Sequence, residues 1–215
     1  LVSPGVVAEL RDLTLRNGSA ASGAGLLVDT GSTVILRRCE IIDCTATVQG
    51  GGIESFGSLT LIDSTLAFNT APQGSAIQSH GSLSMTNSTI TGNLGGGHAV
   101  LVDDGSAVIA FSTIAANSGS NIGVSGPASL NLSSSIIADA AAGSDLSGTV
   151  TSGGFNLIEN PAGSSGLGAT DQTGVDPLLA SLANNGGPTR TMAPAISSPA
   201  NDAGDPGCSL ATDQR

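Results

Sequence analysis

The chain has 215 residues, of which 31 are glycine and only 2% are aromatic, and it contains no tryptophan, tyrosine or lysine. Seventeen acidic residues against six arginines give a formal net charge of −11. This charge opposes binding to nucleic acid or to an anionic membrane surface. No apolar run approaches the length of a membrane-spanning helix, so no transmembrane segment is expected.

A repeat of about 24 residues organises most of the chain. Well-formed copies run through residues 57–69, 81–93 and 105–117, and more divergent copies through residues 10–18, 34–44 and 130–140. The apolar residue late in each copy falls at Leu15, Ile41, Leu66, Ile90, Ile114 and Ile137, with spacings of 26, 25, 24, 24 and 23 residues. Self-similarity with such a period is typical of solenoid proteins.

Each copy has the pattern of a β-strand. Apolar residues alternate with small polar ones, as in Leu59 and Leu61 or Leu83 and Met85, and a period of two indicates a strand. A second apolar element, preceded by glycine, separates the copies, as in residues 50–53. We therefore predict an all-β fold, a right-handed single-stranded parallel β-helix of about six coils of about 24 residues.

Equivalent residues of successive coils should stack on one another, which predicts columns of like side chains. The predicted core column consists of Leu66, Ile90, Ile114 and Ile137. The predicted asparagine ladder consists of Asn69, Asn93 and Asn117. Burial of apolar surface stabilises the first column. In the second, asparagine tolerates a turn conformation and its amide can bond to backbone and to the next asparagine, so we interpret both columns as structural.

Cys39 and Cys44 lie five residues apart, in register with a serine column and with the asparagine ladder. In an oxidising compartment they could form a local disulfide across a corner of the coil. Strand alternation does not say whether their sulfur atoms face each other, so both the disulfide and two free thiols stay open. Two cysteines with no nearby histidine fall short of a zinc site.

The candidate polar residues lie in turns or at strand starts. His80 and His98, on adjacent coils, are interpreted as solvated loop residues, with a catalytic base as the alternative. The pair Asp103 and Asp104 is either a charged turn or a contact for a cation or a sugar. Calcium between acidic turns is the one cofactor considered. The sequence therefore assigns no catalytic, cofactor-binding or metal-binding residue.

The chain divides into coils over residues 1–158 and an irregular segment over residues 159–215. An open β-helix end exposes apolar core and unpaired backbone groups. We therefore expect the irregular segment to act as a loop-rich C-terminal cap.

Several segments resemble known bacterial surface proteins. The Leu-x-x-Asn and Ile-x-x-Asn repeats (66–69, 90–93 and 114–117) resemble those of polymorphic outer membrane proteins. Residues 154–158, 176–179, 184–189, 198–204 and 212–215 resemble the C-terminal region of choice-of-anchor Q β-helix proteins, from which Asn201 departs because the family usually has an aliphatic residue there. The resemblance implies a secreted or surface-anchored bacterial protein that continues beyond Arg215, where a disulfide partner of Cys208 would lie.

Three function classes are weighed. The first is a structural or adhesive stalk, without an evident catalytic site, that contacts a glycan or a host or cell-surface protein. The second is a polysaccharide lyase or glycoside hydrolase of the pectate-lyase-like type, which would need clustered carboxylates and a base. The third is ice binding, suggested by the file of Thr65, Thr89 and Thr113. The acidic residues of neighbouring coils are scattered along the sequence, which favours the stalk over the enzyme.

Overall fold

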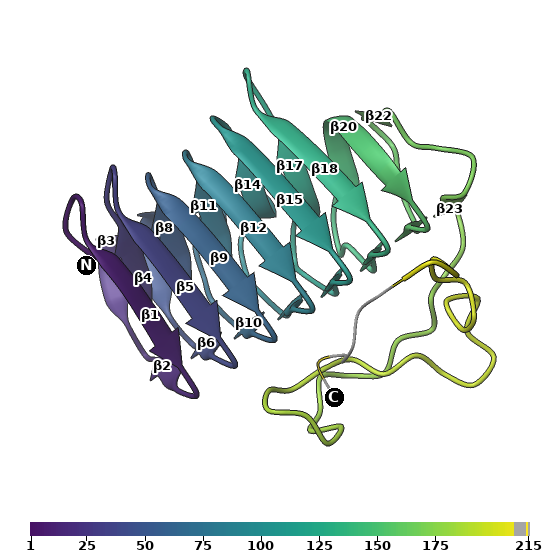
Figure 1. Ribbon diagram of the computed structural model, residues 1–215, viewed down its shortest axis with the longest axis horizontal. Helices are drawn as coiled ribbons and strands as arrows, with labels where there is room; N and C mark the ends of the chain where they lie inside the picture. Colours follow the sequence, from purple (N-terminus) through teal and green to yellow (C-terminus); the bar gives the residue numbers. More distant parts are fainter. Residues whose placement is uncertain (209–213, 215) are drawn as a thin grey trace.

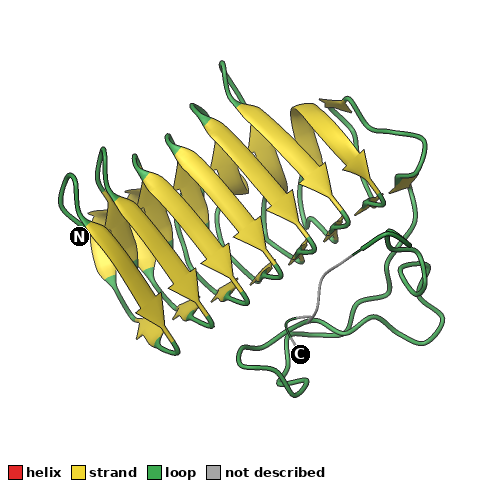
Figure 2. Cartoon of the chain, viewed as in Figure 1, coloured by secondary structure: helices red, strands yellow, loops and turns green. Residues whose placement is uncertain are grey.

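The computed structural model describes residues 1–208 and Gln214, and it forms a parallel β-solenoid of about six turns followed by a tail (Figure 1). The described residues are in strands, turns and loops, without a helix (Figure 2). It follows that this part of the chain contains no helix of the length and apolarity needed to cross a membrane. The predicted all-β solenoid with a spacing of about 24 residues is confirmed.

Each coil passes in order through three faces, which we call face 1, face 2 and face 3. Face 1 contains β1 (Val7–Arg11), β5 (Thr33–Arg37), β9 (Ser58–Ile62), β12 (Ser82–Thr86), β15 (Ser106–Ala110) and β18 (Ser129–Ser133). Face 2 contains β2 (Thr14–Arg16), β6 (Glu40–Ile42), β10 (Thr65–Ala67), β13 (Thr89–Thr91), β16 (Thr113–Ala115), β19 (Ile136–Ala138), β21 (Leu157–Ile158) and β23 (Gln172–Thr173). Face 3 contains β4 (Leu26–Val28), β8 (Ile53–Ser55), β11 (Ile77–Ser79), β14 (His98–Val102) and β17 (Ser120–Val124).

Faces 1 and 3 belong to one continuous sheet. The long strand β20 (Leu146–Gly154) pairs with β17 through its first residues and with β18 through its later ones, and so joins the two faces. The short strand β22 (Ser164–Ser165) adds to β20. A separate pair, β3 (Ser19–Ser22) and β7 (Thr45–Gln49), lies between faces 2 and 3 in the first two coils.

The coils stack in the register that the repeat predicts. In face 2, Leu66 pairs with Ile41 on one side and with Ile90 on the other, and the pairing continues to Ile114 and Ile137. Every one of these ladders is parallel, and in a parallel ladder equivalent side chains lie above one another at a spacing of about 4.8 Å. The four residues of the predicted core column, Leu66 to Ile137, are each 0% exposed. The core is therefore a narrow stack of aliphatic side chains, which agrees with the scarcity of aromatic residues.

The corners on either side of face 2 are single residues with a left-handed backbone. One corner is formed by Asp12, Arg38, Asp63, Asn87, Phe111 and Ser134, with φ between 47° and 55°. The other is formed by Asp43, Phe68, Gly92, Ala116 and Asp139, with φ between 55° and 66°. Six of these eleven residues are Asp, Asn or Gly, which reach positive φ most readily, whereas the other five are Arg, Phe, Ser or Ala, which seldom do. The stacked strands on both sides hold these five in the same conformation, so residue type reveals only part of the corners.

The tail does not simply cover the last coil. Pairing of the coils continues beyond residue 158, the expected boundary, because β23 pairs with β21. The chain then turns back, and Figure 1 shows it lying along the short strands of face 2. Arg190 contacts β6 and β10, and Thr189 donates to the Asp63 carbonyl at the corner before β10, which fixes this course. A lateral position is favoured because the outer side chains of face 2 offer polar groups that bond to an irregular backbone.

Candidate functional site

The predicted asparagine ladder is an internal hydrogen-bonded column. Asn93 is 0% exposed, and its amide nitrogen donates to the Leu66 carbonyl at 3.1 Å and to Asn117 Oδ1 at 3.0 Å. Its Oδ1 accepts from the backbone and side-chain nitrogens of Asn69 at 2.9 and 3.0 Å. The ladder thus satisfies buried backbone groups at one corner, and it offers no group to a ligand.

Cys39 and Cys44 are free, buried thiols, so the local disulfide considered above is not formed. Cys39 lies in the serine column, where its N–H donates to Ser64 Oγ at 3.1 Å. Cys44 lies on the asparagine ladder, where its N–H donates to Asn69 Oδ1 at 3.1 Å. The two side chains occupy columns at opposite ends of β6, which explains why they do not meet. Burial raises the pKa of the Cys44 thiol.

The threonine file of face 2 lies under the tail. Thr65 and Thr89 are 0% and 2% exposed. The Thr65 hydroxyl donates to the Arg190 carbonyl at 2.7 Å, and that of Thr89 donates to Gln214 Oε1 at 2.8 Å. Because the tail covers two of the three threonines, they do not form an exposed flat surface. This removes the basis for the ice-binding interpretation.

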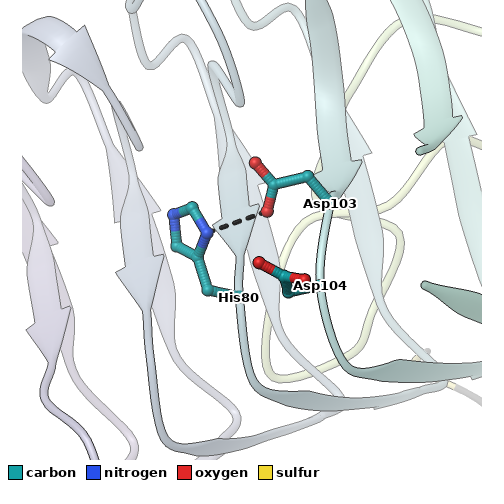
Figure 3. Close-up of side chains that lie close together, drawn as sticks. All are labelled: His80, Asp103 and Asp104. Atoms are coloured by element: carbon teal, nitrogen blue, oxygen red, sulfur yellow. Dashed lines mark ion pairs between the residues drawn. The ribbon is translucent and has the colours of Figure 1, made fainter. Parts of the chain in front are cut away.

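The structure brings together two candidates that the sequence treated separately, His80 and Asp103 (Figure 3). Ser79 pairs with Val102 in face 3, so the next residues, His80 and Asp103, are register neighbours. Asp103 Oδ1 lies 2.8 Å from His80 Nδ1. Asp104 places a carboxylate beside them, with one ligand atom from each of the three residues within 4.8 Å of the others. His98 begins β14, at the opposite end of that strand from Asp103.

Two further side chains of face 3 complete what we call the His80 cluster. Glu54 and Gln78 are register neighbours that point outward from β8 and β11, yet they are only 3% and 1% exposed. Gln78 Nε2 donates to Asp103 Oδ2 at 2.7 Å. Glu54 Oε1 lies 3.8 Å from His80 Nε2. The imidazole therefore lies between two carboxylates, one near each ring nitrogen.

Neighbouring residues restrain the imidazole and the buried carboxylate. The ring of Phe56, the register neighbour of His80 on the preceding coil, stacks on the imidazole with centroids 4.5 Å apart and planes 6° apart. The Nε2 atom of Gln49 donates to Glu54 Oε1, and the same atom lies 3.4 Å from His80 Nε2. A buried carboxylate needs such partners, because an unpaired one would be costly. The cluster is therefore held in place from several sides.

A second acidic group lies where the last coils meet the tail. Asp139, Glu159 and Asp176 bring carboxylate oxygens within 4.8 Å of one another. Asp139, Glu159 and the buried Asp145 also line a surface depression of about 600 Å³. Burial, followed by the negative charges of Glu159, Asp176 and Asp145, raises the pKa of Asp139. This group concentrates negative charge at the surface. Unlike the His80 cluster, it contains no histidine.

The spacing of residues in the sequence contains a signal for the His80 cluster, although no local motif does. Phe56, His80 and Asp103 are spaced by 24 and 23 residues, and Glu54 and Gln78 by 24. Both spacings equal the repeat period, so stacking follows from the register alone. Two of the acidic residues, Glu54 and Asp103, fall near His80 once outward-facing positions are aligned by coil.

The His80 cluster can accept and donate several hydrogen bonds, can supply nitrogen and oxygen ligands to a cation, and holds an imidazole that a carboxylate orients. No family model matches the chain, and neither the curated proteins nor the solved structures include a match. A function for this protein must therefore be inferred from the geometry of face 3.

Proposed function

We propose that the protein is a structural and adhesive β-helix, secreted or displayed on a bacterial cell surface, that binds an uncharged glycan along face 3. The observation that carries this proposal is the His80 cluster: planar hydrogen-bonding side chains on three consecutive coils. Their spacing follows that of the coils, about 4.8 Å per step. A ligand that crosses the strands would meet similar groups at regular intervals, which suits an extended polymer.

The chemistry of these side chains supports a polyhydroxylated ligand. Carboxylates accept through two oxygens, so the partly exposed Asp103 and the exposed Asp104 can engage neighbouring hydroxyls beside the imidazole of His80. Gln78 is 1% exposed and lies beneath these groups, where its Nε2 holds Asp103 through the hydrogen bond to Oδ2. The exposed edge of Phe56, a residue that is 40% exposed, adds apolar surface next to the polar groups. Sugars present the same alternation of hydroxyls and apolar C–H patches.

The charges favour an uncharged ligand. Glu54, Asp103 and Asp104 place three carboxylates around one imidazole, in a chain of net charge −11. The five arginines of the described chain, Arg11, Arg16, Arg37, Arg38 and Arg190, pair with acidic residues of faces 1 and 2. An anionic polymer would therefore meet repulsion on face 3.

The proposed location rests on the resemblance of the repeats and the C-terminal segments to polymorphic outer membrane and choice-of-anchor Q proteins. A stiff solenoid suits the display of a binding face away from a surface, because each coil contacts only its neighbours and the rod needs no partner domain to stay extended. A host or cell-surface protein is the alternative partner.

A glycan array probed with the purified chain, with calcium and again with a chelator, tests the binding proposal. We expect uncharged glycans to bind, and Gln78→Ala to weaken binding about 10-fold through loss of bonds within the cluster. Asn131→Ala is the matched control, because it removes an exposed side-chain amide from face 1. Preference for anionic glycans, or equal loss in both variants, would contradict the proposal.

The alternative is a polysaccharide lyase or glycoside hydrolase, and the imidazole between two carboxylates is the observation that favours it. A lyase acting on an acidic glycan also needs positive charge to grip the substrate, and the cluster supplies carboxylates instead. Release of new reducing ends or unsaturated products from any glycan that binds would establish the enzyme. Binding without release would support adhesion.

A further inference from the structure

We infer that His80, Asp103 and Asp104 form a binding site for a divalent transition-metal ion of the zinc class. This inference does not depend on glycan binding. The three residues come from two adjacent coils, and Figure 3 shows their polar atoms converging on one region outside face 3. Imidazole nitrogen and carboxylate oxygen are both zinc ligands, and three protein ligands are the number found in open zinc sites.

The distances are compatible with such an ion. His80 Nδ1 and Asp103 Oδ1 are 2.8 Å apart, and one ligand atom from each of the three residues lies within 4.8 Å of the others. Zinc–ligand bonds of about 2.0–2.2 Å place tetrahedral ligand atoms roughly 3.4 Å apart. Binding would move His80 Nδ1 and Asp103 Oδ1 slightly apart, and a side-chain rotation would bring in the exposed Asp104 carboxylate. Three protein ligands leave a fourth position for water or a ligand hydroxyl.

The two oxygens of the Asp103 carboxylate differ in their contacts. Its Oδ2 accepts a hydrogen bond from Gln78 at 2.7 Å, whereas its Oδ1 is buried and accepts none. Oδ1 forms an ion pair with His80 Nδ1 at 2.8 Å. A buried carboxylate oxygen without a hydrogen bond is costly in a folded protein. A cation that takes the place of the proton between Nδ1 and Oδ1, with the two atoms moving slightly apart, would be bound by a lone pair of each.

The outer contacts have the arrangement that supports metal ligands. A metal-bound histidine usually directs its other ring nitrogen toward a carboxylate or a carbonyl group, which fixes the ring. Here Nε2 of His80 lies 3.8 Å from the buried Glu54, and Phe56 stacks on the ring plane. Gln78, which is 1% exposed, holds the other oxygen of Asp103 in the same way.

The ligand types select among cations. Imidazole favours zinc, cobalt, nickel and copper, whereas calcium takes six to eight oxygen ligands. The group at Asp139, Glu159 and Asp176 offers oxygen alone and is therefore the internal competitor for calcium. We expect the two places to differ in preference, with transition metals at His80.

Cobalt titration of the purified, metal-free full chain tests the site, because Co²⁺ is paramagnetic and zinc can displace it. The chain has only two histidines, so ring signals in a nuclear magnetic resonance spectrum can be assigned from single variants. We expect Co²⁺ to broaden the His80 signals and spare those of His98, and Zn²⁺ to restore them. Broadening of His98 alone, or of neither histidine, would overturn the inference.

The Zn²⁺ affinities of single variants test the role of each residue. His80→Gln and Asp104→Asn each remove one ligand and should weaken Zn²⁺ binding by about 100-fold or more, since loss of an outer partner alone costs about 10- to 100-fold. Gln78→Leu keeps the ligands and should weaken binding about 10-fold. His98→Gln and Asp176→Asn are the controls and should bind as the parent does.

Two results would assign the metal elsewhere and refute the site. One is an affinity unchanged by both His80→Gln and Asp104→Asn, each checked for folding by its thermal transition. The other is a Co²⁺ spectrum with a thiolate charge-transfer band that disappears in Cys208→Ser, which would place the ion on an exposed thiol. Asp104 is exposed, so its variant tests the site even where His80→Gln disturbs the coil.

Discussion

The coils and the tail are held by different kinds of interaction. The coils are joined by continuous parallel ladders over an aliphatic core, and each adds a similar increment of stability to its neighbours. The described tail is held on face 2 by a few side chains, chiefly the pairing of Arg190 with Glu40 and the bonds of Thr189 and Gln214. Damage to one coil should therefore spread along the rod, whereas damage to the tail should stay local.

The largest effect is expected in the core of the coils. Ile90→Asp places a carboxylate in a column where the parent side chain is 0% exposed, without a partner of opposite charge. We expect a loss of more than about 4 kcal/mol of unfolding free energy and failure of the rod to fold cooperatively. Val108→Asp is the control, because Val108 is 47% exposed on face 1, and it should change stability by about 0.5 kcal/mol or less. Unchanged melting of Ile90→Asp would contradict the inward position of Ile90.

The asparagine ladder should come next. Asn93→Leu removes the acceptor for two nitrogens of Asn69 and the donor to the Leu66 and Thr91 carbonyls, all inside the coil. Each buried group left without a bond costs about 1–3 kcal/mol, so we expect a total loss of about 3 kcal/mol or more. Chemical denaturation measures it, with Asn131→Leu on the exposed side of β18 as the control. Equal losses in the two variants would show that the ladder contributes little.

The coils could be predicted from the sequence because the same pattern of apolar and polar residues recurs in each of them. The alternation and the period gave the strand type, the parallel stacking and the column that runs from Leu66 to Ile137. The same period could have placed His80 beside Asp103, but a search by residue type along the chain compares neighbours in sequence and not neighbours in the stack. The tail has no repeat, and its position depends on single contacts such as that of Arg190 with Glu40, which no local pattern encodes.

The tail should detach without unfolding the coils. Glu40 accepts from Nε and Nη2 of Arg190 at 3.0 Å each and from its backbone N–H at 3.1 Å. Glu40→Gln keeps the shape of the side chain and removes its charge, and hydrogen bonds to charged groups contribute about 1.5–3 kcal/mol. We expect faster hydrogen exchange at Ala183 and Thr191, whose N–H groups bond within the tail, and unchanged exchange at Ile90. Arg190→Gln should give the same pattern.

A double-mutant cycle of these two substitutions separates the pair from indirect effects. A coupling energy of about 1 kcal/mol or more is expected for a half-buried, bidentate pair. Faster exchange throughout the coils in either variant would show that the tail is part of the cooperative unit and would remove the distinction between the two regions.

The smallest effect is expected where the coils meet the tail. Asp139 belongs to a coil corner and Asp176 to the tail, and repulsion among the carboxylates contributes, after burial, to the raised pKa of Asp139. A carboxyl group whose folded pKa is raised keeps its proton longer in the folded chain than in the unfolded one. Stability is therefore lost as pH rises from the ordinary value of 3.8 through the folded pKa, and the whole loss is present at neutral pH.

Asp139→Asn should accordingly raise the melting temperature at pH 7 by about 1–2 °C, the range of favourable surface changes, and the gain should vanish as pH falls to about 4. Asparagine tolerates the left-handed backbone of this corner, where φ is 55°. Asp43→Asn is the matched control, because Asp43 occupies the equivalent corner with φ of 56°. Its Oδ2 lies 3.5 Å from Arg16 Nη2, so its charge is paired. That variant should lose a little stability at pH 7. A gain in both would mean that general negative charge, and not the junction of coil and tail, sets the effect.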